Sequence, residues 1–566
     1  MPARIELLCL FCILGSFFAG CGKNEDTVYL PGQIIVDSHN PAWLVYNRDN
    51  DNNGRLDPAF ICGPGDPEGF LYRGNRNPDG TREGDQEELI EKLAAHGGNC
   101  IYMIAVRTHG GDAWKSARDN PKVYPDDKHN PWIGQDPARG VNTAILDQWD
   151  EWFSLMDENG IIIYFFIYDD AIKIADQFGW ALDADGNLNP DEKSFVQTLV
   201  NRFEHHKNLV WCVMEEGQEI GQHWRQHISQ IARAVREADD HDHVIAAHQL
   251  GGNIFYHAED PHIDQFAIQT SRERVTTVGD LHDWMLTAWE TANGRYSLNM
   301  SEDAVQGNVS VPNNDRTEIR QRNWTAAMAG AYSMVLGMNI DDTPAEWLTD
   351  CKTLYSFFES TTFNMMHPAD SLAAGETMYV LAADPFDYIA YSSASTRNLG
   401  LHLTGKGEYT LKWIDCISGK TEYGKHTSQI KGEILWHKPS GFGNEVAVFV
   451  QRTDRSIAEL QRSLVQQKTT SEIARGNIAP VAENKQMVVK ADSTVYIQLL
   501  YDDPDGGPGP YTITIVSPPE HGELSGRGND RYYTPDKGYT GQDQFSWQVS
   551  DGEDVSGLAR MNLVVR

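Results

Sequence analysis

Apolar runs and longer amphipathic segments alternate from about residue 34 to residue 366. The apolar runs lack strict alternation of polar and apolar positions, as expected for strands that are covered on both faces. In the segments between them apolar residues recur at one-turn spacing, for example Trp149, Phe153 and Met156, which predicts amphipathic helices. We therefore predict an α/β fold with eight parallel strands, a (β/α)8 TIM barrel over residues 30–370. The predicted strands are 59–63, 100–106, 161–168, 209–214, 244–248, 265–269, 296–300 and 332–338.

The pattern changes after the barrel. Residues 371–452 contain short alternating strands between Gly, Ser, Asp and Lys turns, which predicts a β-sandwich. A polar stretch, 453–477, is typical of a linker. Residues 478–566 again contain short strands with Gly, Pro and Asp turns, the spacing of an immunoglobulin-like sandwich without its cysteine pair. The fold class is therefore a TIM barrel followed by two all-β sandwich domains.

The net charge and the N-terminal segment limit the kinds of partner that the protein is expected to bind. The chain has 81 Asp and Glu against 47 Lys and Arg, a net charge of −34, which disfavours nucleic acid and anionic membrane surfaces. Arg4, an apolar stretch and then small residues predict a signal peptide over residues 1–21 and an exported chain. The ending Phe18-Ala-Gly-Cys21 resembles a bacterial lipobox, which implies lipidation of Cys21. We expect contact with the cell membrane or outer membrane only through this anchor; the alternative is a soluble secreted protein.

Two glutamates stand where strand-like runs end. Glu216 closes the run 208–216, and Glu302 closes the run 295–302. Chemistry in a parallel barrel gathers at the carboxyl ends of the strands. Hydrolysis of a glycosidic bond needs a proton donor and a second carboxylate, so we predict that Glu216 and Glu302 are the catalytic pair. The structural alternative is that they are solvated or ion-paired surface residues.

The placement of this pair on strands four and seven resembles the large clan of retaining barrel glycoside hydrolases. In that clan the acid/base closes strand four and the nucleophile closes strand seven. Strand four there commonly ends in Asn-Glu, five residues after a Trp; here Trp211 precedes Glu216 by five residues. The resemblance thus implies that Glu216 is the acid/base and Glu302 the nucleophile. Glu215 takes the place of the Asn and stays as the competing acid.

Two further stretches resemble known modules. The sequence resembles that of barrel hydrolases that carry a domain named for collagen binding. The resemblance lies in Arg316, Arg320, Trp324 and the segment 411–419, and residues 371–452 would be that domain. Segments 502–506 and 545–552 resemble bacterial Ig-like or cadherin-like modules. Such modules are accessories of surface and secreted enzymes.

Other polar residues at strand ends are candidates for binding a sugar, because sugars need dense hydrogen bonding. For each of them a structural role is the alternative. Besides Glu215, these candidate substrate-binding residues are Asp66, Arg107, His109, Tyr168, Asp169, His248, Gln269 and Asp341.

The sequence predicts no organic cofactor and no catalytic metal. The segment 49–57 matches five positions of a calcium loop, yet Phe60 stands where the bidentate Glu belongs. A structural calcium site and a polar hairpin turn both remain open here.

These observations predict an exported glycoside hydrolase that cleaves a polysaccharide or oligosaccharide by retaining double displacement. The alternative is a non-catalytic surface lipoprotein for glycan binding or adhesion. A barrel lyase or esterase is weaker, since the sequence has no serine nucleophile elbow.

Overall fold

The computed structural model describes residues 28–107, 123–170, 172–220, 223–249, 251–270, 275–303, 315–428, 432–456, 459–460, 479–502 and 511–566. The predicted signal peptide, the lipidation site Cys21 and the predicted subsite residue His109 lie outside these residues. None of the helices in the described ranges is long and apolar enough to cross a membrane.

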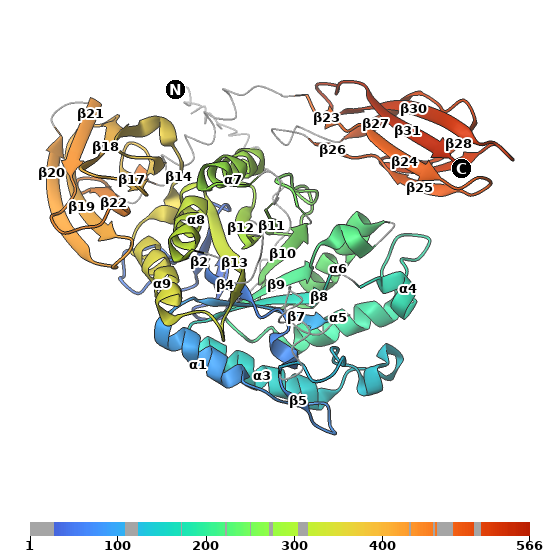
Figure 1. Cartoon of the computed structure of the whole chain (residues 1–566), viewed down its shortest axis with the longest axis horizontal. Coiled ribbons are helices and arrows are strands. Elements are labelled where there is room, and N and C mark those ends of the chain that lie inside the picture. Colours follow the sequence, from blue (N-terminus) through green and yellow to red (C-terminus); the bar gives the residue numbers. More distant parts are fainter. Residues whose placement is uncertain are drawn as a thin grey trace, which may run out of the picture.

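Eight parallel strands form the central sheet in the order β4-β13-β12-β11-β10-β9-β8-β7 (Figure 1). The two end strands β4 and β7 are tied by Asn99, whose backbone N–H donates to the Cys62 carbonyl and whose side chain accepts from the Cys62 N–H. The predicted barrel is thereby confirmed. The strands are β4 (Cys62–Asp66), β7 (Cys100–Val106), β8 (Ile162–Tyr168), β9 (Leu209–Met214), β10 (Val244–Gln249), β11 (Gln265–Gln269), β12 (Ser297–Glu302) and β13 (Ala331–Asn339).

Helices cover the outside of this sheet (Figure 1). Several begin at side-chain caps that satisfy the free N–H groups of a first turn, such as Asn142 before α3 and Thr277 before α7. The helices of the barrel are α1 (Gln86–His96), α3 (Thr143–Glu158), α4 (Ile174–Phe178), α5 (Pro190–Phe203), α6 (Trp224–Ala238), α7 (Val278–Ala292), α8 (Arg316–Met328) and α9 (Ala345–Glu359). Residues 251–264, between β10 and β11, contain no helix.

The predicted aromatic stripes lie in the core between helices and strands. Trp149 and Phe153 of α3 contact Phe165 of β8, and Phe153 also contacts Phe203 of α5. All four side chains are buried. This apolar layer holds the strands in register, so their carboxyl ends form one rigid edge.

An N-terminal three-stranded sheet packs against the barrel: β1 (Ile34–Val36), β2 (Leu44–Tyr46) and β3 (Asp57–Ala59). The predicted first barrel strand, 59–63, begins too early, because β3 ends at Ala59 and β4 starts at Cys62. Glu359 at the end of α9 joins the two sheets, accepting from the Tyr46 hydroxyl at 3.2 Å and from the Phe60 N–H at 3.1 Å.

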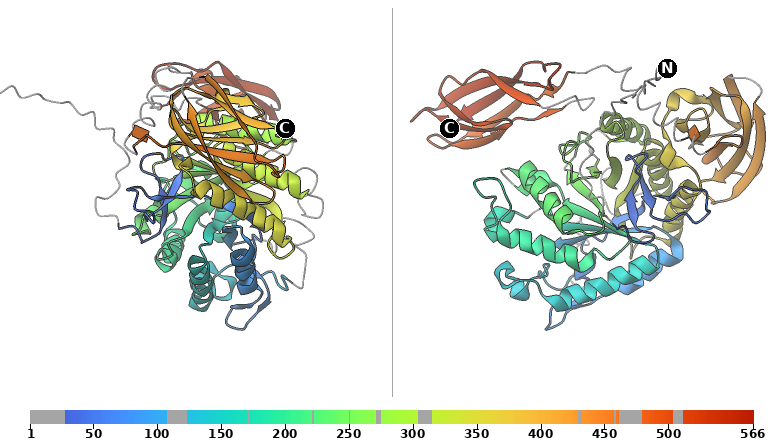
Figure 2. Two further views of the ribbon diagram at one scale, coloured as in Figure 1. Left: turned by 90° about the vertical axis from the view of Figure 1, so that its left-hand side faces the viewer. Right: turned by 180° about the vertical axis from the view of Figure 1, so that it is seen from behind.

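The first sandwich packs directly on the barrel (Figure 2). Trp324 of α8 stacks on Tyr391 with ring centroids 5.3 Å apart, and Arg320 donates to the buried carboxylate of Glu445 at 2.9 Å. The barrel and this sandwich therefore share a core. One sheet contains β14 (His367–Pro368), β16 (Tyr379–Ala383), β17 (Asp387–Ser392), β19 (Gly407–Asp415), β20 (Thr421–Ser428) and β22 (Val446–Arg452); the other contains β15 (Ala373–Gly375), β18 (Asn398–Leu403) and β21 (Gly432–His437).

The C-terminal sandwich has a separate core around Trp547, Phe545 and Tyr533. It contacts the barrel at His223, whose Nε2 lies 2.9 Å from the Tyr532 hydroxyl and whose ring packs on Tyr496. Its sheets contain β24 (Lys485–Val489), β27 (Thr512–Ser517), β30 (Gly541–Ser550) and β31 (Ala559–Val565); β25 (Val495–Gln498), β28 (Gly522–Arg527) and β29 (Asp530–Pro535); and β23 (Val481–Ala482) with β26 (Tyr501–Asp502).

The joint at Glu359 gives stability a pH dependence. Burial raises the pKa of Glu359 from its ordinary 4.5 to about 7, although the bonds from Phe60 and Tyr46 favour the charged form. A raised folded-state pKa contributes stability below pH 4.5, and this contribution is lost as the pH rises through about 7. We predict that the unfolding temperature of the wild type falls relative to that of Glu359→Gln between these two pH values.

Thermal unfolding of both proteins across this pH range checks the prediction. The exposed Glu346 of the same helix is the matched control, and Glu346→Gln should track the wild type at every pH. A difference between the wild type and Glu359→Gln that does not change with pH would contradict the prediction.

Candidate active site

Four neighbouring strands bring the candidate catalytic residues to one edge of the barrel. Glu216 follows β9 within two residues, His248 lies near the end of β10, Gln269 ends β11, and Glu302 ends β12. These strands are adjacent in the sheet and parallel, so their carboxyl ends meet. The sequence-predicted pair therefore lies on the functional face of the fold.

His248 lies between the two predicted catalytic glutamates. The backbone N–H of Glu216 donates to His248 Nδ1 at 3.0 Å, and His248 Nε2 lies 3.5 Å from Glu302 Oε2. Burial lowers the pKa of His248 to about 3, so the imidazole is neutral near pH 7. Because Nδ1 accepts a hydrogen bond, the single ring proton is on Nε2, and this N–H faces the Glu302 carboxylate.

Gln269 also contacts both Glu216 and Glu302. Its side-chain amide donates to Glu216 Oε1 at 2.5 Å, and its backbone pairs with Glu302 in the register of β11 and β12. The Glu302 side chain is nearly buried, whereas Glu216 is partly exposed. The structure thus brings Glu216, His248, Gln269 and Glu302 together.

The backbone of Glu216 adopts an unusual conformation. Its φ is +40°, in the left-handed region that residues with a Cβ rarely occupy. Strain of this kind collects at functional sites because the surrounding structure must compensate for it. Here the residue with this φ stands in the turn between β9 and the 3-10 helix η4 (Gly217–Ile220), and its N–H donates to His248.

Glu215, the competing acid, occupies a different environment. It is only 6% exposed, and the Tyr102 hydroxyl donates to its Oε1 at 2.8 Å. Burial raises its pKa well above the ordinary value, and the nearby carboxylates of Glu68 and Asp170 raise it further. Glu215 is therefore a buried carboxyl that retains its proton more readily than an exposed one.

Arg107 lies within the same buried network. Its Nη2 donates to Glu68 Oε2 at 3.2 Å, and its charge also acts on Asp169 and Glu215. Asp169 is fully buried, with its N–H bonded to the Val106 carbonyl. These predicted subsite residues accordingly form a charged support for the strand ends.

Three other predicted subsite residues have different positions. Tyr168 is fully buried, and its ring packs on Phe195 of α5, which favours its structural alternative. Asp341 pairs with Arg73 at 2.7 Å, an ion pair shared with Asp85, which favours its structural alternative. The side chain of Asp66 lies outside the described part of the structure.

Sequence reasoning missed Asp303, the residue after Glu302. Its carboxylate pairs with the buried guanidinium of Arg322 and accepts from the Thr270 hydroxyl at 2.9 Å. This buried pair connects the ends of β11 and β12 to α8. The available signal was an acidic residue beside a predicted nucleophile, with Arg322 inside the basic run of the next helix.

Two groups have the composition of a metal site. Carboxylate oxygens of Asp49, Asp51 and Asp57 in the predicted calcium loop lie within 4.8 Å of one another, as do ligand atoms of Asp150, His205 and His206. In the first group, Asp57 also accepts from Arg48 Nε at 3.2 Å. Structural calcium stays a prediction, and neither group includes a residue of the carboxylate site.

Comparisons with known proteins agree with this fold. Residues 82–340 match the family described as Apiosidase-like, catalytic domain, and residues 477–564 match the bacterial Ig domain family. A glycoside hydrolase family 5 structure from Bacteroides vulgatus ATCC 8482 is 14% identical, covering 77% of this chain and 96% of its own, with a TM-score of 0.53. Another glycoside hydrolase structure is 15% identical, covering 75% of this chain and 99% of its own, with a TM-score of 0.51.

No curated protein matches the chain at a significant level. The structural likenesses, at these identities, show a shared barrel fold. Together with the family match they support glycosidase activity, and the predicted resemblances to barrel glycoside hydrolases and to bacterial Ig-like modules are confirmed.

The left-handed backbone of Glu216 has a measurable consequence. Glycine adopts positive φ without the Cβ clash, so Glu216→Gly should be more stable than Glu216→Ala by about 1 kcal/mol. At Glu215, whose φ is not positive, the order should reverse, with glycine less stable than alanine by roughly 0.5–1 kcal/mol. Urea unfolding of the four variants measures both differences. The same order of stability between the glycine and alanine variants at both positions would contradict the positive φ of Glu216.

Proposed function

We propose that the barrel is a glycoside hydrolase that cleaves a polysaccharide or oligosaccharide by retaining double displacement. Glu302 is the nucleophile in this proposal, and Glu216 is the acid/base. The observation that carries it is the position of His248, which accepts from the Glu216 backbone N–H and lies 3.5 Å from the Glu302 carboxylate, so that both glutamates stand at one edge of the barrel. The match of residues 82–340 to an Apiosidase-like catalytic domain supports the reaction class.

In the first step Glu302 attacks the anomeric carbon while Glu216 donates a proton to the leaving oxygen. The glycosidic bond breaks, and the sugar becomes an ester of Glu302. In the second step Glu216 removes a proton from water, which attacks the same carbon and releases Glu302. One carboxylate must therefore be charged at the start while the other carries a proton.

The surroundings of the pair suit these roles. His248 Nε2 lies 3.5 Å from Glu302 Oε2. Because His248 is neutral, it orients Glu302 without forming a strong ion pair that would weaken the nucleophile. Gln269 orients the Glu216 carboxyl by donating to its Oε1.

Glu216 is favoured over Glu215 as the acid because the Tyr102 hydroxyl already holds the Glu215 carboxyl. Glu216 is partly exposed at the strand edge, whereas Glu215 is nearly buried and bonded to Tyr102. A proton donor must lie within hydrogen-bond reach of the leaving oxygen. In this proposal Glu215 contributes a buried carboxyl beneath the reacting pair.

The substrate proposal follows from the family match and the predicted export. The name of the matching family makes a glycoside of apiose, a branched pentose, the first substrate to assay. We propose that the chain acts outside the cytoplasm, with a lipid on Cys21 as its anchor. The sandwiches then place the barrel near a polymer at the cell surface.

We predict that Glu302→Gln and Glu216→Gln each lower kcat by about 100-fold to 10,000-fold, because each removes a group that reacts in the transition state. Loss of the acid matters less when the leaving group needs no proton. Glu216→Gln should therefore retain more activity on nitrophenyl glycosides than on alkyl glycosides, whereas Glu302→Gln should lose both equally. Release of aglycone or reducing sugar from a panel that includes apiosides measures this.

Glu151→Gln, on the exposed face of α3, is the matched control and should keep wild-type activity. If Glu215→Gln rather than Glu216→Gln shows the leaving-group dependence, the acid is Glu215. A first product with inverted anomeric configuration in the proton NMR spectrum would refute double displacement.

A further inference from the structure

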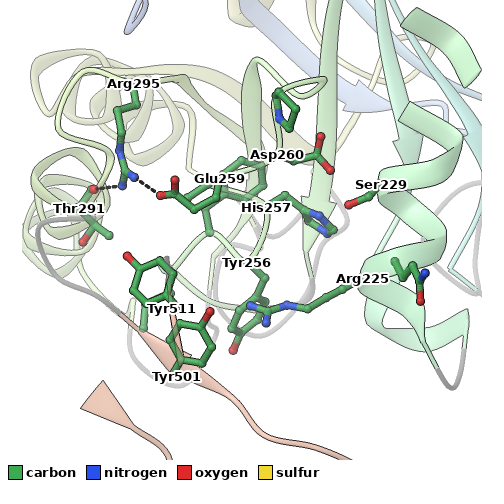
Figure 3. A pocket seen from close by; sticks show the side chains of 15 residues that line it. Arg225, Ser229, Tyr256, His257, Glu259, Asp260, Thr291, Arg295, Tyr501 and Tyr511 are labelled. Carbon is green, nitrogen blue, oxygen red and sulfur yellow. Dashed lines mark hydrogen bonds and ion pairs between the residues drawn. The ribbon is translucent and has the colours of Figure 1, made fainter. Parts of the chain in front are cut away.

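A pocket opens on the flank of the barrel where the fold lacks a helix. A loop, residues 251–264, and not a helix, connects β10 to β11. This loop, the start of α6 and the end of α7 surround a cavity of about 370 Å³, which the C-terminal sandwich completes (Figure 3). A cavity of this size is in the range of small-ligand sites.

The loop that forms the pocket is firmly held. Gln249 at the end of β10 donates to the Ile254 carbonyl at 2.8 Å and accepts from the Tyr256 N–H at 2.7 Å. Phe255 stacks on Phe266 of β11 with ring centroids 4.5 Å apart. The pocket wall is therefore a defined surface, anchored next to His248 in the sequence.

Arg225 of α6 places a cation in this pocket without a matching anion. Its guanidinium lies 4.7 Å from the centroid of the Tyr256 ring. Its buried Nε has no hydrogen-bond partner among the described residues, and no ion pair joins Arg225 to any of them. Burial lowers its pKa, although the nearby Asp530 acts in the opposite direction. By contrast, Arg295 across the pocket pairs with Glu259 at 2.5 Å.

Aromatic rings form part of the remaining wall, which also contains the carboxylates of Glu259 and Asp260. Tyr256 comes from the barrel, while Tyr501 and Tyr511 of the C-terminal sandwich point into the pocket with ring centroids 5.1 Å apart (Figure 3). His257 is buried and neutral, and its Nε2 has no hydrogen-bond partner in the described part of the chain. Flat rings beside polar donors and acceptors suit a sugar, whose C–H faces pack on aromatics while its hydroxyls form hydrogen bonds.

We propose that this interdomain pocket binds an anionic sugar unit of the polymer, with its ring against the tyrosines and its carboxylate or sulfate facing Arg225. The inference that the ligand is a carbohydrate rests on the proposed function. The inference that the ligand is negatively charged rests on Arg225. The net charge of −34 repels anions at long range, so recognition of one requires a local cation such as Arg225, which has no ion-pair partner among the described residues.

Isothermal titration with the full-length protein tests the proposal, using Glu302→Gln as background so that no probe is hydrolysed. The probes are oligogalacturonate, its fully methyl-esterified form and a sulfated galactan oligosaccharide. We expect at least one of the two anionic probes to bind. If oligogalacturonate binds, its neutral methyl ester should bind at least 10-fold more weakly. Arg225→Gln and Tyr256→Ala should each weaken binding of the anionic probe at least 10-fold.

Arg233→Gln is the matched control, because Arg233 lies on the exposed face of the same helix and pairs with Glu237. It should bind like the background protein. Arg225→Gln in the wild-type chain should also leave kcat on a small aryl glycoside unchanged, which separates this site from the proposed catalytic one. Absence of binding by both anionic probes, or equal binding by Arg225→Gln, would overturn the proposal whether or not the barrel hydrolyses glycosides.

Discussion

The proposed active site depends on the contacts that the neutral imidazole of His248 makes with Glu216 and Glu302. Because its Nδ1 accepts from the Glu216 backbone, its only proton faces Glu302. Glu216 stands in a left-handed turn, and the register of four adjacent strands brings these residues to one edge of the barrel. If burial did not keep the imidazole uncharged, it would donate from both nitrogens, and the bond that positions Glu216 would be lost.

Much of the barrel could be predicted from the sequence because apolar runs and helical stripes are local signals. The ends of the runs also identified Glu216 and Glu302, since strand ends require only the order of elements. Side-chain direction was harder: Tyr168 ends β8 yet turns outward to Phe195. The ion pair between Asp303 and Arg322 was missed because such pairing depends on how α8 packs against the strand ends, which no local pattern encodes.

The two sandwiches relate to the barrel in different ways. The first shares an apolar core with it, through Trp324 and Tyr391 and the buried pair of Arg320 and Glu445, so the two are expected to unfold together. The C-terminal sandwich has its own core and meets the barrel through polar and aromatic contacts at His223. Between the two domains lies the pocket that Arg225 and three tyrosines line.

The central claim is that Glu302 forms a covalent bond to the sugar. It is tested most directly by incubating the protein with a 2-deoxy-2-fluoro glycosyl fluoride of the sugar it hydrolyses, which slows release of the intermediate, followed by peptide mass spectrometry. The account predicts one added glycosyl group, on the peptide that contains Glu302 and at that residue. A label on Glu215 or Glu216, or full turnover of the reagent with no covalent adduct at any time, would contradict it.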